Sequence, residues 1–290
     1  MTERTLRWQV GRTRITSVVE AQTDGIPPVF FFPEATEEGI KRHGWLVPQF
    51  ADGEGRIRMR VQAFVIEAGD RVVVVDPCIG NGKPREMPFW NDQSWPFLER
   101  FGEAGFDPAG VDQVVHTHLH VDHVGWDTHL EDGRWVPTFT RARHLYVQRE
   151  LEWFRQDTEG DAPRINEDSV APIFDAGLAD IVAPDADLGD GLRLEPTVGH
   201  TPGHASLWVE SEGEVAVITG DAIHHPVQCA EPTLGFVSDH TPAAALTTRA
   251  DLLRRAADRG ALVLGTHFPT SPGGRLVPDG EAWRFEPVTA

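Results

Sequence analysis

The 290-residue chain has few cysteines and no long hydrophobic run. Its two cysteines, Cys78 and Cys229, lie far apart and form no CxxC pair, so they do not make a disulfide framework. The first seven residues lack the apolar core of a signal peptide. No run approaches the roughly 20 apolar residues of a membrane-spanning helix. We therefore expect a reduced, cytoplasmic protein without a membrane partner.

Positive charge is also scarce in this sequence. The chain has 26 Lys and Arg residues against 45 Asp and Glu residues, which gives a formal net charge of −19. Nucleic-acid binding needs a basic surface, so this balance disfavours a nucleic acid or an acidic membrane surface as a partner. We expect a small-molecule substrate instead.

Nothing in the composition resembles a flexible linker, and no internal repeat is visible by period. We therefore expect a single domain over residues 1–290, long enough to bury about 75% of its unfolded surface. The pattern predicts hairpins over 6–22 and 61–75, helices over 94–103, 149–155 and 242–259, and strands over 113–117, 144–147, 192–198, 206–210, 215–219 and 262–264. Thr241 and Ser94 are the candidate helix N-caps, and Gly260 is a good helix stop.

The most informative segment is His116-Thr117-His118-Leu119-His120-Val121-Asp122-His123. It follows an apolar strand, and alternate residues of an extended chain point the same way. Imidazole and carboxylate groups are good ligands for zinc and similar divalent ions. The segment therefore predicts a metal site rather than a solvated histidine-rich loop.

Three further segments place ligand-type residues where apolar strands give way to loops. His204 ends Gly199-His200-Thr201-Pro202-Gly203-His204 and precedes a strand. Asp221 follows the strand 215–219, and His267 follows the strand 262–264.

In these motifs and their order, residues 60–270 resemble the metallo-β-lactamase superfamily of dinuclear metallohydrolases. The resemblance implies an αββα sandwich, here with an aromatic-rich N-terminal insertion over 24–58. It implies that one divalent ion is held by His118, His120 and His204. The other would be held by Asp122, His123 and His267, with Asp221 between the two. Zinc is the first expectation for both ions, with manganese, iron or cobalt as alternatives.

The resemblance also implies metal-assisted hydrolysis, in which a hydroxide shared by the two ions attacks the substrate. Asp122 would carry a proton to the leaving group, and Asp76 would orient a ligand histidine. The acyl-homoserine-lactone lactonases of this superfamily carry a tyrosine three residues after the bridging aspartate, where this chain has His224. We predict that His224 acts near the substrate, as a hydrogen-bond donor or an acid.

Other enzymes of this superfamily differ in how well their metal ligands match this sequence. The β-lactamases with a cysteine at the position of Asp221 and the diiron flavoproteins with a glutamate at the position of His120 are disfavoured. A lactone or related carboxylic ester is the leading substrate. A phosphotriesterase and a glyoxalase II-like thioesterase remain alternatives, as does a catalytically silent metal-binding protein.

Several conspicuous residues have simpler interpretations. We expect structural roles for His116 and His200, a core position for Tyr146, and a solvated helix face for the basic group Arg249, Arg254, Arg255 and Arg259. Segment 24–58 is too apolar for a free loop, and could be a lid, a homodimer contact or a segment packed on the sheet. Phe30, Phe31, Phe32, Trp90 and Trp95 belong to the core or to an apolar substrate pocket.

Overall fold

The computed structural model describes residues 5–288, whose contacts fall into two compact units. Unit 1 comprises Met1–Ala21 and Val61–Pro184, and unit 2 comprises Gln22–Arg60 and Asp185–Ala290. The prediction of one domain over 1–290 stays a prediction. The prediction about a signal peptide falls mostly on residues 1–4, which lie outside the described range. Within residues 5–288, no helix combines the length and the apolar character that crossing a membrane requires.

The sheet of unit 1 has seven strands in the order β1-β2-β3-β4-β5-β8-β9. Strands β1 and β2 form the predicted N-terminal hairpin, and β3 and β4 form the second one. Strands β4, β5, β8 and β9 are parallel neighbours, and β5 is buried on both faces, as apolar parallel strands usually are. The bounds are β1 Leu6–Val10, β2 Thr13–Ile26, β3 Ile57–Ala68, β4 Arg71–Val75, β5 Gln113–Val115, β8 Arg143–Val147 and β9 Ala179–Val182.

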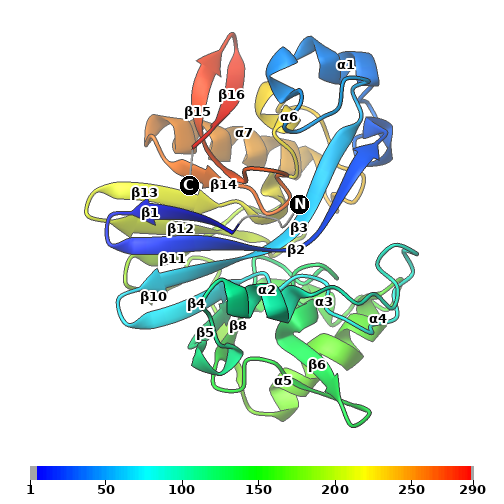
Figure 1. The fold of residues 1–290 in the computed structure, drawn as a ribbon, viewed down its shortest axis with the longest axis vertical. Coiled ribbons are helices and arrows are strands. Elements are labelled where there is room, and N and C mark those ends of the chain that lie inside the picture. Colours follow the sequence, from blue (N-terminus) through cyan, green and yellow to red (C-terminus); the bar gives the residue numbers. More distant parts are fainter. Residues whose placement is uncertain (1–4, 289–290) are drawn as a thin grey trace. The chain divides into compact units, whose positions relative to one another are not determined.

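The helices of unit 1 are short and lie around the β4, β5 and β8 end of this sheet (Figure 1). The helix expected from Ser94 begins only at Phe97, because the proline at position 96 restricts the residue before it to extended backbone. The bounds are α2 Phe97–Glu103, α3 Gln148–Phe154, α4 Ala162–Ile165, a π-helical turn Asn166–Val170, α5 Ala171–Asp175, the 3₁₀ turns Pro108–Gly110 and Gly125–Asp127, and a small hairpin of β6 Thr128–Glu131 and β7 Arg134–Pro137.

Unit 2 holds the second sheet, in the order β10-β11-β12-β13-β14-β15-β16. All neighbours are antiparallel except β13 and β14, which are joined through the long helix α7. Helix α7 starts after Thr241 as predicted, although the Thr241 side chain makes no capping hydrogen bond, and it stops before Gly260. The bounds are β10 Asp187–Gly189, β11 Leu192–Pro196, β12 Ala205–Ser211, β13 Glu214–Ile218, β14 Leu262–Leu264, β15 Gly273–Asp279, β16 Ala282–Pro287, α1 Glu37–Arg42, α6 Val227–Ala230, α7 Pro242–Asp258, and the 3₁₀ turns Pro28–Phe30, Gly44–Leu46 and Gly220–Ala222.

The aromatic segment 24–58 packs into the core of unit 2. Phe32, Leu46 and Phe50 are fully buried there, and the Phe50 ring meets the Phe285 ring edge-on with centroids 5.8 Å apart. Part of this segment therefore packs in the core, and its roles as a lid or a homodimer contact stay predictions. Phe30 stays exposed at its tip.

Candidate metal centre

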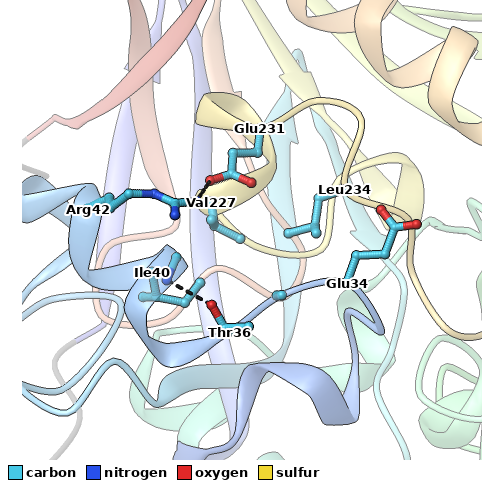
Figure 2. Close-up of a pocket in the computed structure, with 9 residues that line it drawn as sticks. Glu34, Thr36, Ile40, Arg42, Val227, Glu231 and Leu234 are labelled. Atoms are coloured by element: carbon cyan, nitrogen blue, oxygen red, sulfur yellow. Dashed lines mark hydrogen bonds and ion pairs between the residues drawn. The ribbon is translucent and has the colours of Figure 1, made fainter.

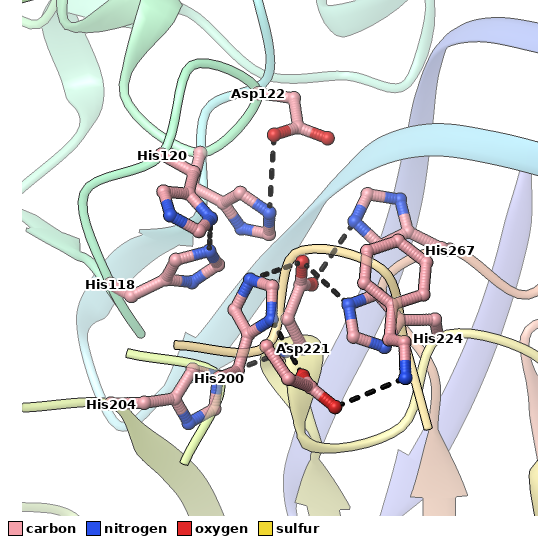
Figure 3. Close-up of polar contacts among 12 residues, drawn as sticks. His118, His120, Asp122, His200, His204, Asp221, His224 and His267 are labelled. Carbon is pink, nitrogen blue, oxygen red and sulfur yellow. Dashed lines mark hydrogen bonds and ion pairs between the residues drawn. The ribbon is translucent and has the colours of Figure 1, made fainter. Parts of the chain in front are cut away.

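The histidine-rich segment of unit 1 begins directly after β5. Its His118 and His123 side chains are fully buried. The His118 Nε2 atom lies 3.1 Å from His120 Nδ1, and His123 Nε2 lies 3.6 Å from Asp122 Oδ1 (Figure 3). The strand end thus gathers the four predicted ligands of this unit in one place.

Asp76 fixes the orientation of this segment. It follows β4 with a positive φ of 51° and accepts hydrogen bonds from the backbone N–H and the hydroxyl of Thr117, at 2.8 and 2.7 Å. Its second oxygen also lies 3.1 Å from His123 Nδ1. Because the Thr117 hydroxyl gives its proton to Asp76, His118 Nδ1 donates to Thr117 at 3.0 Å, and His118 Nε2 keeps its lone pair. Such outer hydrogen bonds set the tautomer of metal-ligating histidines.

In unit 2, three imidazole rings face one carboxylate. Asp221 follows β13 in the turn Gly220–Ala222. Its Oδ1 lies 3.0 Å from His267 Nε2, and its Oδ2 lies 3.3 Å from His200 Nε2 and 3.2 Å from His224 Nε2 (Figure 3). The group is buried, so each of these contacts needs a proton or a cation between its two atoms.

The far nitrogens of two of these rings already carry protons. His267 Nδ1 donates to the backbone carbonyl of Arg60 at 2.8 Å, and His200 Nδ1 donates to Asp239 Oδ1 at 3.1 Å. Burial lowers the pKa of His200 to about 4, even though its carboxylate neighbours favour the charged ring. A neutral ring with Nδ1 protonated presents an Nε2 lone pair to Asp221. That donor set fits a divalent cation, whose ligands must be deprotonated.

His204 has a different place from the one that the resemblance gave it. Its Nδ1 lies 2.8 Å from the Thr197 hydroxyl, and its Nε2 accepts the backbone N–H of Asp221 at 2.9 Å. The lone pair that a metal would need is therefore used by the Asp221 backbone. His200, for which we expected a structural role, faces the Asp221 carboxylate, with its Nε2 atom 3.3 Å from Asp221 Oδ2. The ligand role predicted for His204 stays a prediction, although the contacts of His200 suit that role better.

The two histidines share one Gly-His-Thr-Pro-Gly-His turn, so their spacing gave no means of choosing between them. Gly199 has φ 139°, and a Cβ there would lie 2.3 Å from the Ala245 backbone nitrogen. Glycine at this position therefore allows the backbone of the turn to lie against the first turn of α7.

His224 lies beside Asp221, as expected of a residue near the site. Its ring is buried and stacks on Phe236 with centroids 3.4 Å apart. Burial lowers the pKa of His224, against the attraction of Asp221. Within residues 5–288, its Nδ1 atom has no hydrogen-bond partner. His225 is structural, because its ring donates to the Phe50 carbonyl and accepts the Val227 N–H.

His116 and Tyr146 belong to a separate buried network in unit 1. Asp127 lies 3.0 Å from His116 Nε2 and 3.0 Å from His144 Nδ1, and the Tyr146 hydroxyl donates to it at 3.3 Å. Although burial opposes it, the attraction of the two rings holds the pKa of Asp127 well below its usual range. This network fits the structural roles predicted for His116 and Tyr146.

A shallow surface pocket of unit 2 lies elsewhere, between α1 and α6 (Figure 2). Ile40, Val227 and Leu234 line its apolar part, and Arg42 pairs with Glu231 at 3.7 Å along its rim. The predicted metal ligands do not line this pocket, so it is not the candidate site.

Comparison with known proteins confirms the resemblance and the fold class. The family model described as the Metallo-beta-lactamase superfamily matches residues 56–267. The solved structure of the hydrolase AbOPH, described as in the beta lactamase superfamily, superposes with a TM-score of 0.83 at 23% identity, covering 100% of this chain and 99% of that one. AidC, described as a dizinc quorum-quenching lactonase in complex with a product, gives 0.81 at 17% identity, covering 99% and 98%.

Sequence relatives include N-acyl homoserine lactonases. AttM of Rhizobium radiobacter is 33% identical over 129 residues, covering 41% of this chain and 46% of AttM. AttM of Azorhizobium caulinodans is 31% identical over 196 residues, covering 61% and 68%. The chain thus spans about half the length of the first of these relatives and two thirds of the second.

Proposed function

Because this chain belongs to the metallo-beta-lactamase superfamily, we propose that it is a metal-dependent hydrolase that opens a lactone or a related carboxylic ester. The observation that carries the proposal is the Asp221 carboxylate, which three imidazole rings face within 3.3 Å. The curated relatives named N-acyl homoserine lactonases support the choice of substrate class.

We assign two divalent ions, zinc first, to the ligand set of the resemblance with one change. His118, His120 and His200 would hold one ion, Asp122, His123 and His267 would hold the other, and Asp221 would add its carboxylate to the set. When bound, such a pair supplies an activated water as nucleophile and polarises the carbonyl oxygen of the substrate.

The chain's own residues supply orientation and proton transfer. Asp76 and Thr117 hold His123 and His118 in the ligand tautomer. Asp122 takes the proton released in the attack and delivers it to the leaving oxygen, as a carboxylate beside the nucleophile can. His224 directs Nε2 toward Asp221, and among residues 5–288 its buried Nδ1 atom has no hydrogen-bond partner. The substrate is a small molecule, and we keep a cytoplasmic location as part of the proposal.

A substrate panel tests this function. Zinc-loaded protein is assayed with a pH indicator on an acyl-homoserine lactone, a simple γ-lactone, paraoxon and a glutathione thioester, with Asp221→Ala as control. We expect lactone turnover that the substitution abolishes. Turnover confined to paraoxon or to the thioester would replace the lactonase by one of its alternatives. Silence on all four substrates would overturn the hydrolase.

A further inference from the structure

Arg249 of α7 lies entirely inside unit 2 rather than on the solvated helix face that the sequence suggested. Its Nε donates to the backbone carbonyl of Ala222 at 2.9 Å. One terminal nitrogen donates to the carbonyls of Leu234, at 2.8 Å, and Pro232, at 3.3 Å. The other lies 3.5 Å from Asp239 Oδ2. A single buried guanidinium thus joins α7 to two segments, the turn at Ala222 and the loop over residues 232–239.

Each of these segments leads to the surroundings of Asp221. Ala222 is the next residue after Asp221 in the same 3₁₀ turn. Asp239 accepts the Nδ1–H of His200 and, at 3.1 Å, the backbone N–H of Phe236. Phe236 in turn stacks on the His224 ring. The guanidinium therefore contacts the turn that carries Asp221 and the loop that orients both neighbouring histidines.

We propose that Arg249 is a positioning residue of the metal site, which sets the Asp221 turn directly and the His200 ring through Asp239. The inference rests on the proposed function, since it takes His200 and Asp221 as ligands. Asp239 is the link, because a carboxylate on His200 Nδ1 keeps that proton in place and leaves the Nε2 lone pair for an ion. Burial would raise the pKa of Asp239, but the hydrogen bond from His200 and the nearby rings hold it below its usual range.

The shape of the guanidinium explains why this position is arginine. A planar fork reaches carbonyls and a carboxylate in different directions at once, whereas an ammonium is a compact point charge. Lysine at this position would keep the charge but lose most of the contacts. Outer hydrogen bonds of this kind typically change metal affinity by about 10–100-fold.

Zinc affinity of the full chain tests the proposal. Arg249→Met, Arg249→Lys, Asp239→Asn and the Arg249→Met/Asp239→Asn double variant are compared with the parent protein by competition with a chromophoric chelator. We expect zinc binding to weaken by about 10–100-fold in Arg249→Met and Asp239→Asn. The double variant should lose less than the sum of the two single losses, because part of the effect of Arg249 passes through Asp239. The visible spectrum of the cobalt-substituted protein should shift in the same variants.

Arg85→Lys is the matched control. Arg85 is a buried arginine of unit 1 that forms an ion pair with Asp168, at 2.6 Å. Its substitution should lower the unfolding temperature without changing zinc affinity or the cobalt spectrum. If Arg249→Met does not fold, the zinc affinities of Arg249→Lys and Asp239→Asn test the positioning role instead.

The outcomes separate this inference from the proposed function. A parent protein that binds zinc and hydrolyses lactone, together with folded Arg249 and Asp239 variants of unchanged zinc affinity, would overturn the positioning role alone. Additive losses in the double variant would overturn the route through Asp239. A parent protein that binds no zinc would overturn the proposed function, and this inference with it.

Discussion

The hydrogen-bond partner of one imidazole nitrogen decides what the other nitrogen can do. The carbonyl of Arg60 and the carboxylate of Asp239 fix protons on His267 and His200. Both rings then turn a lone pair toward Asp221. His204 lacks that freedom, because the Asp221 N–H already occupies its Nε2 atom. In the ligand set that we propose, a single hydrogen bond therefore separates His200 from His204.

Substituting the two histidines separately should reveal this difference. We expect His200→Ala to bind zinc at least 10-fold more weakly, since an ion loses a ligand. His204→Ala should keep its zinc content but lose about 1–3 kcal/mol of unfolding free energy, because a buried backbone N–H loses its acceptor. Metal analysis by mass spectrometry and urea unfolding measure the two effects. Full zinc content in His200→Ala with loss in His204→Ala would restore the original assignment.

His225 should make the metal-free protein sensitive to acid. Burial lowers its pKa to about 4, below the ordinary value of 6.5. The unfolded chain therefore binds the proton first as the pH falls, so the folded state loses stability between pH 6.5 and pH 4. We expect this residue to contribute about 2–3 kcal/mol to the fall in unfolding free energy between pH 7 and pH 4.5.

His225→Gln can keep both hydrogen bonds without titrating. Urea unfolding of both metal-free proteins at the two pH values gives the comparison. The variant should show the smaller fall, and equal falls in the two proteins would contradict the assignment.

Among the elements, the apolar strands were the easiest to predict. Strand β14 has the predicted bounds, and β4, β5, β8 and β13 begin and end within one or two residues of their predicted bounds. A run of valine, isoleucine or leucine that ends at a ligand residue has few interpretations other than a buried strand. The four ligand-type residues after β5 were found by the same reasoning. The start of a helix was harder to predict, because it depends on single residues. Helix α2 begins at Phe97, after Pro96, and not at the predicted Ser94.

Contacts between segments distant in sequence could not be predicted. Helical spacing places Arg249 on the same face as the buried Ala245 and Leu252, but it does not reveal the partners of the guanidinium, which come from residues 222–239. The choice between His200 and His204 likewise depended on contacts with Asp221 and Asp239, which the spacing of their shared turn does not record.

The π-helical turn of unit 1 depends on a buried ionic network. Asp168 in this turn accepts two hydrogen bonds from Arg85, at 2.6 and 2.9 Å, and its backbone carbonyl accepts one from Lys83, at 2.8 Å. Burial lowers the pKa of Lys83 to about 8, although Asp168 opposes that shift. The carboxylate therefore compensates two buried cations.

Removing the Asp168 carboxylate should lower the stability of the folded protein. We expect Asp168→Ala to lower the unfolding free energy by about 3–5 kcal/mol, because a buried arginine and a buried lysine lose their partner. Asp180→Ala is the control, since its pair with Arg143 is exposed and should contribute about 1 kcal/mol or less. Urea denaturation measures both, and equal losses would show that the buried network is not specifically stabilising.

The negative net charge of the whole molecule favours the binding of divalent cations. A chain with a formal charge of −19 gains favourable interactions from divalent cations, and the proposed ligands include two carboxylates, Asp122 and Asp221. An ion that binds only the folded chain stabilises it by mass action.

Chelation should therefore lower the thermal stability of the protein. With free zinc 1,000-fold above its dissociation constant, the stabilisation is about 4 kcal/mol, or about 10 °C in Tm for a chain of this size. We expect a chelator to remove that increment from the parent protein and to change Asp221→Ala little. Scanning calorimetry with and without chelator provides the test, and an equal shift in both proteins would place the stabilising ion elsewhere.

The most direct test of a metal-dependent hydrolase is a zinc titration of chelator-stripped protein, followed by the hydrolysis of an acyl-homoserine lactone. We expect no turnover in the stripped protein and a rise in rate that levels off near two zinc ions per chain. Turnover that persists in the stripped protein, or zinc-loaded protein that leaves the lactone intact, would contradict it.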